Sequence, residues 1–114
     1  MPRDETFLLY MLLAARRVIR STADVSRQEF DTNAEKKDSV VLQLGNIGEA
    51  ASRISKAFQA EHTEIPWSDI IGMRHRLFHG YEETDWNTVW TAATEEVPDL
   101  IHLIEPLVPP EEEI

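Results

Sequence analysis

Apolar residues recur every three or four positions along most of this 114-residue chain, and this spacing restricts the fold more than any other feature. Such spacing places apolar side chains along one face of an α-helix, whereas a half-buried β-strand alternates apolar and polar residues. The sequence shows no sustained alternation. It therefore predicts an all-α protein whose amphipathic helices bury one common face.

The first half of the chain contains two predicted helices. The first extends from Asp4 to Arg20. The polar segment from Ser21 to Lys37 lacks sustained periodicity and is predicted to be a loop, in which Ser26 caps a short turn ending near Phe30. Periodicity resumes in a long second helix from about Glu35 to Gln59.

The second half contains two more predicted helices. Pro66 suits the first turn of the third helix, which extends to about His79 and is capped by Gly80. Asp85 is the predicted N-cap of the fourth helix, whose apolar stripe stays in register across Pro98. Since proline removes one helical hydrogen bond, a kink is expected there. The predicted architecture is an antiparallel bundle of four helices with a kinked last helix.

Length and composition limit what surrounds this bundle. The chain is long enough for one compact domain, predicted at residues 1–108, and the remaining residues 109–114 form an acidic tail. Without cysteine it has neither disulfides nor thiolate metal sites, which suits a reducing cytoplasm. The apolar stretch from Phe7 to Ala15 is too short to span a membrane and lacks a signal-peptide cleavage pattern. We expect it to be a core helix, and we expect no membrane partner.

The formal net charge of -10 does not exclude RNA, because the charge is unevenly distributed. All 11 Lys and Arg residues lie at or before Arg76. Of the 21 Asp and Glu residues, 10 lie from Glu82 onward, which leaves 11 in the same part of the chain as the cations. The first two-thirds of the chain is therefore neutral overall, which permits a locally basic surface there.

The segment "GMRHRLFHGY", Gly72 to Tyr81, concentrates the groups that can perform chemistry. On an ideal helix, with about 100° per residue, the surrounding apolar residues fall within about 60° of Arg74. A guanidinium on an apolar face is costly to bury unpaired, so this position favours a carboxylate, a partner chain or a phosphate as its neighbour. His75 and His79 lie one turn apart and border a groove.

Three interpretations of this segment stay open on spacing alone. Arg74 could pair with an internal acid while both histidines face solvent. His75 and His79 could bind a metal ion together with Glu82 or His62, although the segment lacks the adjoining glutamate of an H-E-x-x-H site. The third interpretation is acid–base chemistry on a phosphodiester, with histidine moving a proton and arginine holding the non-bridging oxygens.

A family resemblance favours the third interpretation. "RHRLFHGY" resembles the R-x4-6-H signature of the HEPN superfamily, in the R-x4-6-H-x-Y form of HepT-like toxins from HepT/MntA toxin–antitoxin pairs, with Arg74, His79 and Tyr81 at the three positions. "NIGEAASRIS", "IPWSDIIGMR" and "VW" followed by a proline-containing helix resemble the second, third and fourth helices of that family. One departure is His75, where HepT-like proteins usually carry asparagine.

The resemblance implies a HEPN-type bundle and a metal-independent endoribonuclease that needs no cofactor. It implies a homodimer in which both signatures line one cleft, with His79 as general acid or base, Arg74 on the phosphate and His75 assisting by hydrogen bonding. It also implies that a minimal nucleotidyltransferase antitoxin, similar to MntA, adenylylates Tyr81. An alternative is a non-catalytic HEPN protein that serves as the substrate-binding partner of such a nucleotidyltransferase.

Two observations on the residues bear on this picture. Arg74 and His79 lie about 140° apart on one ideal helix, so a second subunit could complete the site. Gly45 and Gly48 cost the second helix about 1 kcal/mol each relative to alanine, which indicates a packing or interface role. A homodimer across the second and third helices is therefore expected. Glu49 beside them either orients the catalytic groups or is a plain surface residue.

Overall fold

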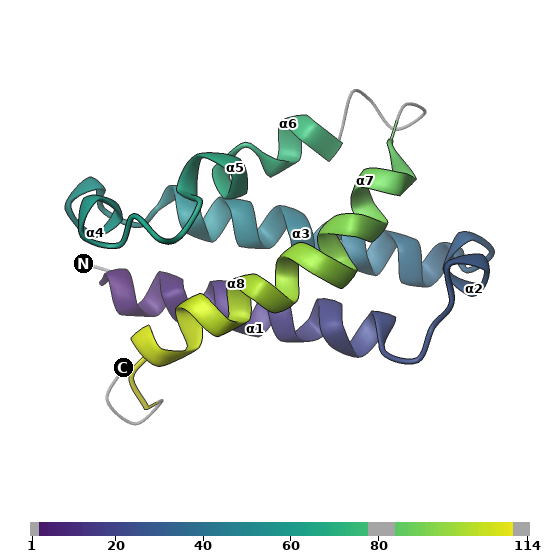
Figure 1. Ribbon diagram of the computed structural model, residues 1–114, viewed down its shortest axis with the longest axis horizontal. Helices are drawn as coiled ribbons and strands as arrows, with labels where there is room; N and C mark the ends of the chain where they lie inside the picture. Colours follow the sequence, from purple (N-terminus) through teal and green to yellow (C-terminus); the bar gives the residue numbers. More distant parts are fainter. Residues whose placement is uncertain (1–2, 78–83, 111–114) are drawn as a thin grey trace.

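The computed structural model describes residues 3–77 and 84–110 and arranges them as an all-α bundle, which confirms the predicted fold class (Figure 1). The helices are α1 (Asp4–Thr22), α2 (Arg27–Asp31), α3 (Ala34–Ser52), α4 (Lys56–Glu61), α5 (Trp67–Ile71), α6 (Met73–Leu77), α7 (Trp86–Thr91) and α8 (Val97–Ile104). A π-helical turn, Ala92–Glu96, joins α7 to α8, and a short 3-10 helix, Glu105–Leu107, follows α8. Within the described residues, no helix is long and apolar enough to cross a membrane.

The core lies where α1 and α3 pack side by side, with α5 and α6 on α3 and α8 on α1 (Figure 1). Its largest fully buried side chains are Phe30, Leu8, Met11, Leu44, Ile47, Ile65, Leu77, Ile104, Val18, Val40, Val89 and Val97. Every buried side-chain nitrogen and oxygen in the described part of the chain has a hydrogen-bond partner. The polar groups available for function therefore lie at the surface of this core.

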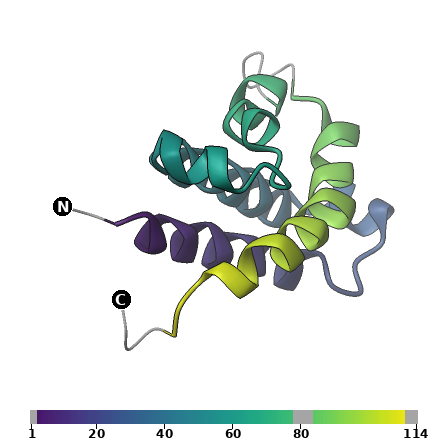
Figure 2. The same cartoon turned by 60° about the vertical axis from the view of Figure 1, so that its left-hand side comes forward.

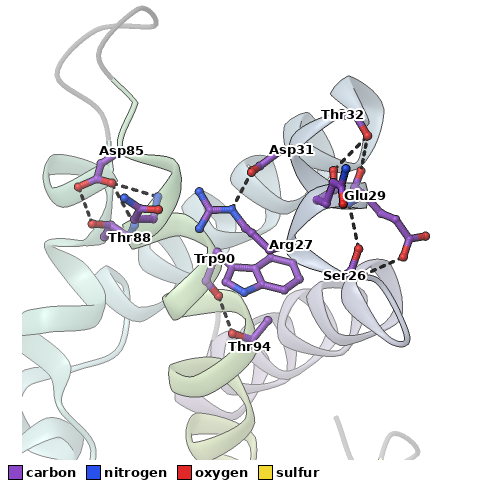
Figure 3. A network of polar contacts seen from close by, with 11 residues as sticks. Ser26, Arg27, Glu29, Asp31, Thr32, Asp85, Thr88, Trp90 and Thr94 are labelled. Atoms are coloured by element: carbon purple, nitrogen blue, oxygen red, sulfur yellow. Dashed lines mark hydrogen bonds and ion pairs between the residues drawn. The ribbon is translucent and has the colours of Figure 1, made fainter.

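The first predicted helix is confirmed, and the predicted loop after it is shorter than expected. α2 occupies the middle of that loop because Ser26 and Glu29 form a capping box, in which each side chain accepts a hydrogen bond from the other residue's backbone N–H (Figure 3). The Ser26 backbone N–H, followed by its hydroxyl, lowers the pKa of Glu29. The predicted cap at Ser26 is confirmed, and Phe30 is fully buried.

The prediction of one long helix from Glu35 to Gln59 is wrong, because α3 ends at Ser52 and α4 begins at Lys56. The carboxylate of Asp4 stabilises this break. It accepts hydrogen bonds from the Ser55 backbone N–H at 2.9 Å and from the Ser55 hydroxyl at 2.7 Å. The Ser55 hydroxyl oxygen also caps α4 by accepting the Phe58 backbone N–H. Contacts with the first turn of α1 thus replace the helical bonds that the periodicity predicted.

The two glycines of α3 have different surroundings. A Cβ added at Gly48 would lie 2.9 Å from the carbonyl oxygen of Ile70, so Gly48 permits the close approach of α3 and α5 within one chain. A Cβ added at Gly45 would meet nothing within 4 Å. The predicted packing role is therefore confirmed at Gly48, whereas Gly45 leaves an open notch on the surface of α3.

We expect Gly48→Ala and Gly45→Ala to change stability in opposite directions. At Gly48 the clash with a backbone oxygen outweighs the better helix propensity of alanine, for a net loss of about 1 to 2 kcal/mol in the free energy of unfolding. At Gly45 only the propensity changes, and stability should rise by up to about 1 kcal/mol. Urea unfolding followed by circular dichroism measures both variants, and equal effects would contradict the assignment.

The fourth predicted helix begins as expected, and its α-helical pattern is interrupted in the turn that precedes Pro98. Asp85 caps α7 by accepting the backbone N–H groups of Asn87 and Thr88, and hydrogen bonds from the Thr88 hydroxyl and backbone lower its pKa (Figure 3). Figure 2 shows α7 and α8 running in different directions. The π-helical turn between them contains Thr94, four residues before Pro98, where a proline ring crowds the helical carbonyl, and Pro98 itself occupies the first turn of α8. The kink expected at Pro98 is therefore confirmed.

Candidate active site

The third predicted helix is divided at Gly72, and this break determines where Arg74 lies. Gly72 has ψ near 0°, so α5 ends at Ile71 and α6 starts in a changed orientation. As a result Met73 and Leu77 form the buried side of α6, and the Arg74 side chain is 64% exposed. The prediction that Arg74 lies amid the apolar face is therefore wrong, because it assumed one unbroken helix.

Arg74 shares a carboxylate with a second arginine. Its Nη1 lies 3.9 Å from Glu49 Oε2 on α3, while Arg53 approaches Glu49 Oε1 at 3.2 Å through both Nε and Nη2. A separation of 3.9 Å is within ion-pair range but too long for a direct hydrogen bond. Glu49 thus lies within ion-pair range of Arg74 and, among the described residues, takes none of its N–H donors in a direct hydrogen bond.

Arg74 borders a groove on the exposed side of α3. The groove has a volume of about 310 Å³ and is lined by Asp38, Val41, Leu42, Gly45, Asn46, Glu49 and Arg74. Leu42, at 60% exposure, is a large apolar residue left facing water, and it stands beside the open notch at Gly45. The groove therefore brings the Arg74 guanidinium together with two carboxylates and the apolar side chains of Val41 and Leu42.

A second groove lies beside the first on the surface of α3. Its volume is about 270 Å³, and its lining consists of Phe7, Tyr10, Asn46, Glu49, Ala50 and Arg53. Asn46 and Glu49 line both grooves.

Arg53 was missed by sequence reasoning, although a glutamate four residues before an arginine on a helix is a recognisable pairing signal.

The other residues of the signature segment differ in their surroundings. His75 is exposed on α6. Arg76 forms an ion pair with Glu96 at 3.2 Å and thereby joins α6 to the π-helical turn. The predicted site residues His79 and Tyr81, together with Gly80 and Glu82, lie outside the described residues.

The histidine that was considered as a third metal ligand has other contacts. His62 Nδ1 lies 3.2 Å from Glu64 Oε1, and its ring lies 4.2 Å from that of Phe58, centroid to centroid. Within residues 3–77 and 84–110, no three His, Asp or Glu side chains are grouped closely enough to hold a metal ion. Of the predicted site residues that the structure describes, Arg74 and Glu49 lie close together.

Comparison with known proteins decides the family. The family model described as "Ribonuclease HepT-like" matches residues 11–107, which include the whole signature segment. The chain belongs to the HepT-like ribonuclease family. Its HepT-like relatives include "Putative RNase MJ0125" of Methanocaldococcus jannaschii, which is 35% identical over 86% of this chain and 85% of the relative.

Two further relatives support the same HepT-like assignment. "Putative RNase MJ1380" of Methanocaldococcus jannaschii is 33% identical over 86% of this chain and 91% of the relative. "Probable ribonuclease HepT" of Thermococcus cleftensis is 32% identical over 69% of this chain and 72% of the relative. No solved structure gives a significant match.

Proposed function

We propose that this HepT-like chain is the endoribonuclease toxin of a toxin–antitoxin pair and cleaves RNA without a metal ion through its R-x4-H-x-Y signature. The observation that carries the proposal is the family match, which spans residues 11–107 and so contains Arg74, His79 and Tyr81. The exposed Arg74 guanidinium beside a groove supports it, because a phosphodiester can reach those N–H donors.

The proposed chemistry uses the RNA itself as the nucleophile. The 2′-hydroxyl attacks the adjacent phosphorus, and the bond from phosphorus to the 5′-oxygen breaks, which leaves a 2′,3′-cyclic phosphate and a 5′-hydroxyl. His79 moves a proton as general acid or base, and His75 assists by hydrogen bonding. Arg74 stabilises the charge that develops on the non-bridging oxygens, and Glu49 keeps its guanidinium oriented.

The experiment that tests this function is incubation of the purified protein with total RNA in excess chelator. We expect cleavage to persist and the new ends to carry 2′,3′-cyclic phosphates, detected by their resistance to 3′-adapter ligation until the cyclic phosphate is opened and the phosphate removed. Strict dependence on added metal would contradict the mechanism. Absence of cleavage under any condition would favour the non-catalytic HEPN partner, which the net charge of -10 suits better.

We also propose that two copies associate through α3 at Leu42 and Gly45 and place both signatures in one cleft. The exposed Leu42 and the notch at Gly45 support this, since Leu42 of one copy could pack into the notch of the other while the Arg74 end of the groove stays open to RNA. Leu42→Glu should convert a dimer to a monomer in sedimentation velocity. Gln28→Glu, which adds the same charge to an exposed position on α2, should leave the dimer intact; a wild-type monomer at micromolar concentration would refute the proposal.

A further inference from the structure

Tyr10 stands out on the surface of the bundle because a large aromatic ring is left in water. It is 53% exposed, and its ring packs edge to face against Phe7, with centroids 6.0 Å apart and an interplanar angle of 77°. This contact orients the ring without covering it. An exposed and oriented aromatic ring is suited to stacking against another flat group.

The groups beside Tyr10 can recognise a nucleotide. Arg53 lines the same groove, and its side chain is 60% exposed although it pairs with Glu49. The Asn46 amide nitrogen donates to Gln43 Oε1 at 3.4 Å, and Asn46 also lines this groove. An aromatic ring with a guanidinium and an amide is the set of side chains that binds unpaired bases and the phosphates between them.

Tyr10, Asn46 and Arg53 lie next to the groove that Arg74 borders. The groove of Tyr10 shares Asn46 and Glu49 with the groove of Arg74, so the two grooves are adjacent on the surface. Glu49 lies between the two arginines and contacts both. Both guanidiniums stay more than half exposed beside the shared carboxylate, so each could contact a phosphate of one strand.

We propose that Tyr10, Asn46 and Arg53 form a subsite for single-stranded RNA next to the cleavage site, with a base stacked on Tyr10 and a neighbouring phosphate on Arg53. This inference rests on the proposed ribonuclease function. Asp38 and Glu49 offset the charges of Arg53 and Arg74 across the two grooves. Binding therefore depends chiefly on stacking, and its logarithmic salt slope should be no steeper than about -1.4, for two phosphates at about 0.7 each.

The test measures binding without requiring cleavage. A short fluorescent single strand of 2′-O-methyl RNA, which lacks the nucleophilic hydroxyl, is titrated with the full-length protein, and anisotropy is recorded. We expect Tyr10→Ala to weaken binding about tenfold or more and Tyr10→Phe to bind like the unmodified chain. Arg53→Gln should also weaken binding. Arg27→Gln should not, although Arg27 also pairs with a carboxylate four residues away on a helix.

Several outcomes would overturn the subsite. Unchanged affinity in Tyr10→Ala would do so, as would equal binding of double-stranded RNA. Loss of binding only in variants that sedimentation shows to have become monomeric would assign Tyr10 to a contact between copies. Failure of the proposed function is distinguishable: absence of cleavage together with the expected binding pattern leaves the subsite standing, whereas cleavage with identical binding by all variants overturns the subsite alone.

Discussion

His79→Ala should reduce RNA cleavage by at least about a hundredfold, the usual scale for loss of an acid–base group. In the proposed reaction one proton leaves the 2′-hydroxyl and another reaches the departing 5′-oxygen, and alanine can transfer neither. The measurement is the rate of appearance of 2′,3′-cyclic phosphate ends in excess chelator, with protein concentrations matched and folding verified by circular dichroism.

The chain offers matched histidine controls. His102 is exposed on α8, and His62 is held by Glu64 and Phe58, so alanine at either position should leave the cleavage rate within a few fold of the unmodified chain. Cleavage by His79→Ala at the unmodified rate would rule out the proposed role. So would an equal loss in all three variants, because that result would point to folding instead of proton transfer.

Arg74→Lys should fail to preserve cleavage, because lysine keeps the charge but loses the planar pair of N–H donors that grips a phosphate. Arg76→Lys is the matched control two residues away. Its ion pair with Glu96 is exposed and requires only a positive charge, so this variant should retain activity. Full activity in Arg74→Lys would show that the guanidinium acts only as a point charge.

Tyr81→Phe should abolish neutralisation by a nucleotidyltransferase antitoxin. Adenylylation would add a phosphate charge and a bulky base to the signature, where they would compete with RNA for the Arg74 guanidinium. We therefore expect that co-expression with the cognate nucleotidyltransferase raises the mass of the chain by one or more adenylyl groups and abolishes cleavage. Intact-mass spectrometry measures the first effect, and the chelator assay measures the second.

The second tyrosine of the chain makes this experiment selective. Of the two tyrosines, Tyr10 is 53% exposed, so a nucleotidyltransferase that merely modified accessible phenols would modify it as well. Tyr10→Phe should still gain the adduct, and Tyr81→Phe should not. An adduct mapped to any residue other than Tyr81, or full neutralisation of Tyr81→Phe, would show that this tyrosine is not the switch.

Periodicity predicted the helical class correctly and failed where distant contacts decide the backbone. Ile54 and Phe58 keep helical spacing across the break between α3 and α4, because both still pack against the core. The hydrogen bonds from Ser55 to Asp4 join residues that are 51 positions apart, and no local pattern contains them.

The candidate site was predicted in part for a similar reason. The signature identified Arg74, but an ideal wheel placed it on the buried face, since a wheel cannot represent the change of direction at Gly72. Glu49 was singled out only as a possible supporting residue, and the structure places its carboxylate between Arg74 and Arg53. Which carboxylate meets which guanidinium depends on the separation of α3 and α6, which sequence spacing does not encode.

The contact at Gly48 gives this small protein an unusual vulnerability. Because a Cβ at residue 48 would lie only 2.9 Å from the carbonyl oxygen of Ile70, α3 could carry a side chain there only by moving away from α5. Glu49 is the next residue on α3, and Arg74 follows α5 closely. A single added methyl group, far too small to reach RNA, would therefore shift the arginine relative to its carboxylate. The distance between Arg74 and Glu49 in the candidate site thus depends on the absence of a side chain at residue 48.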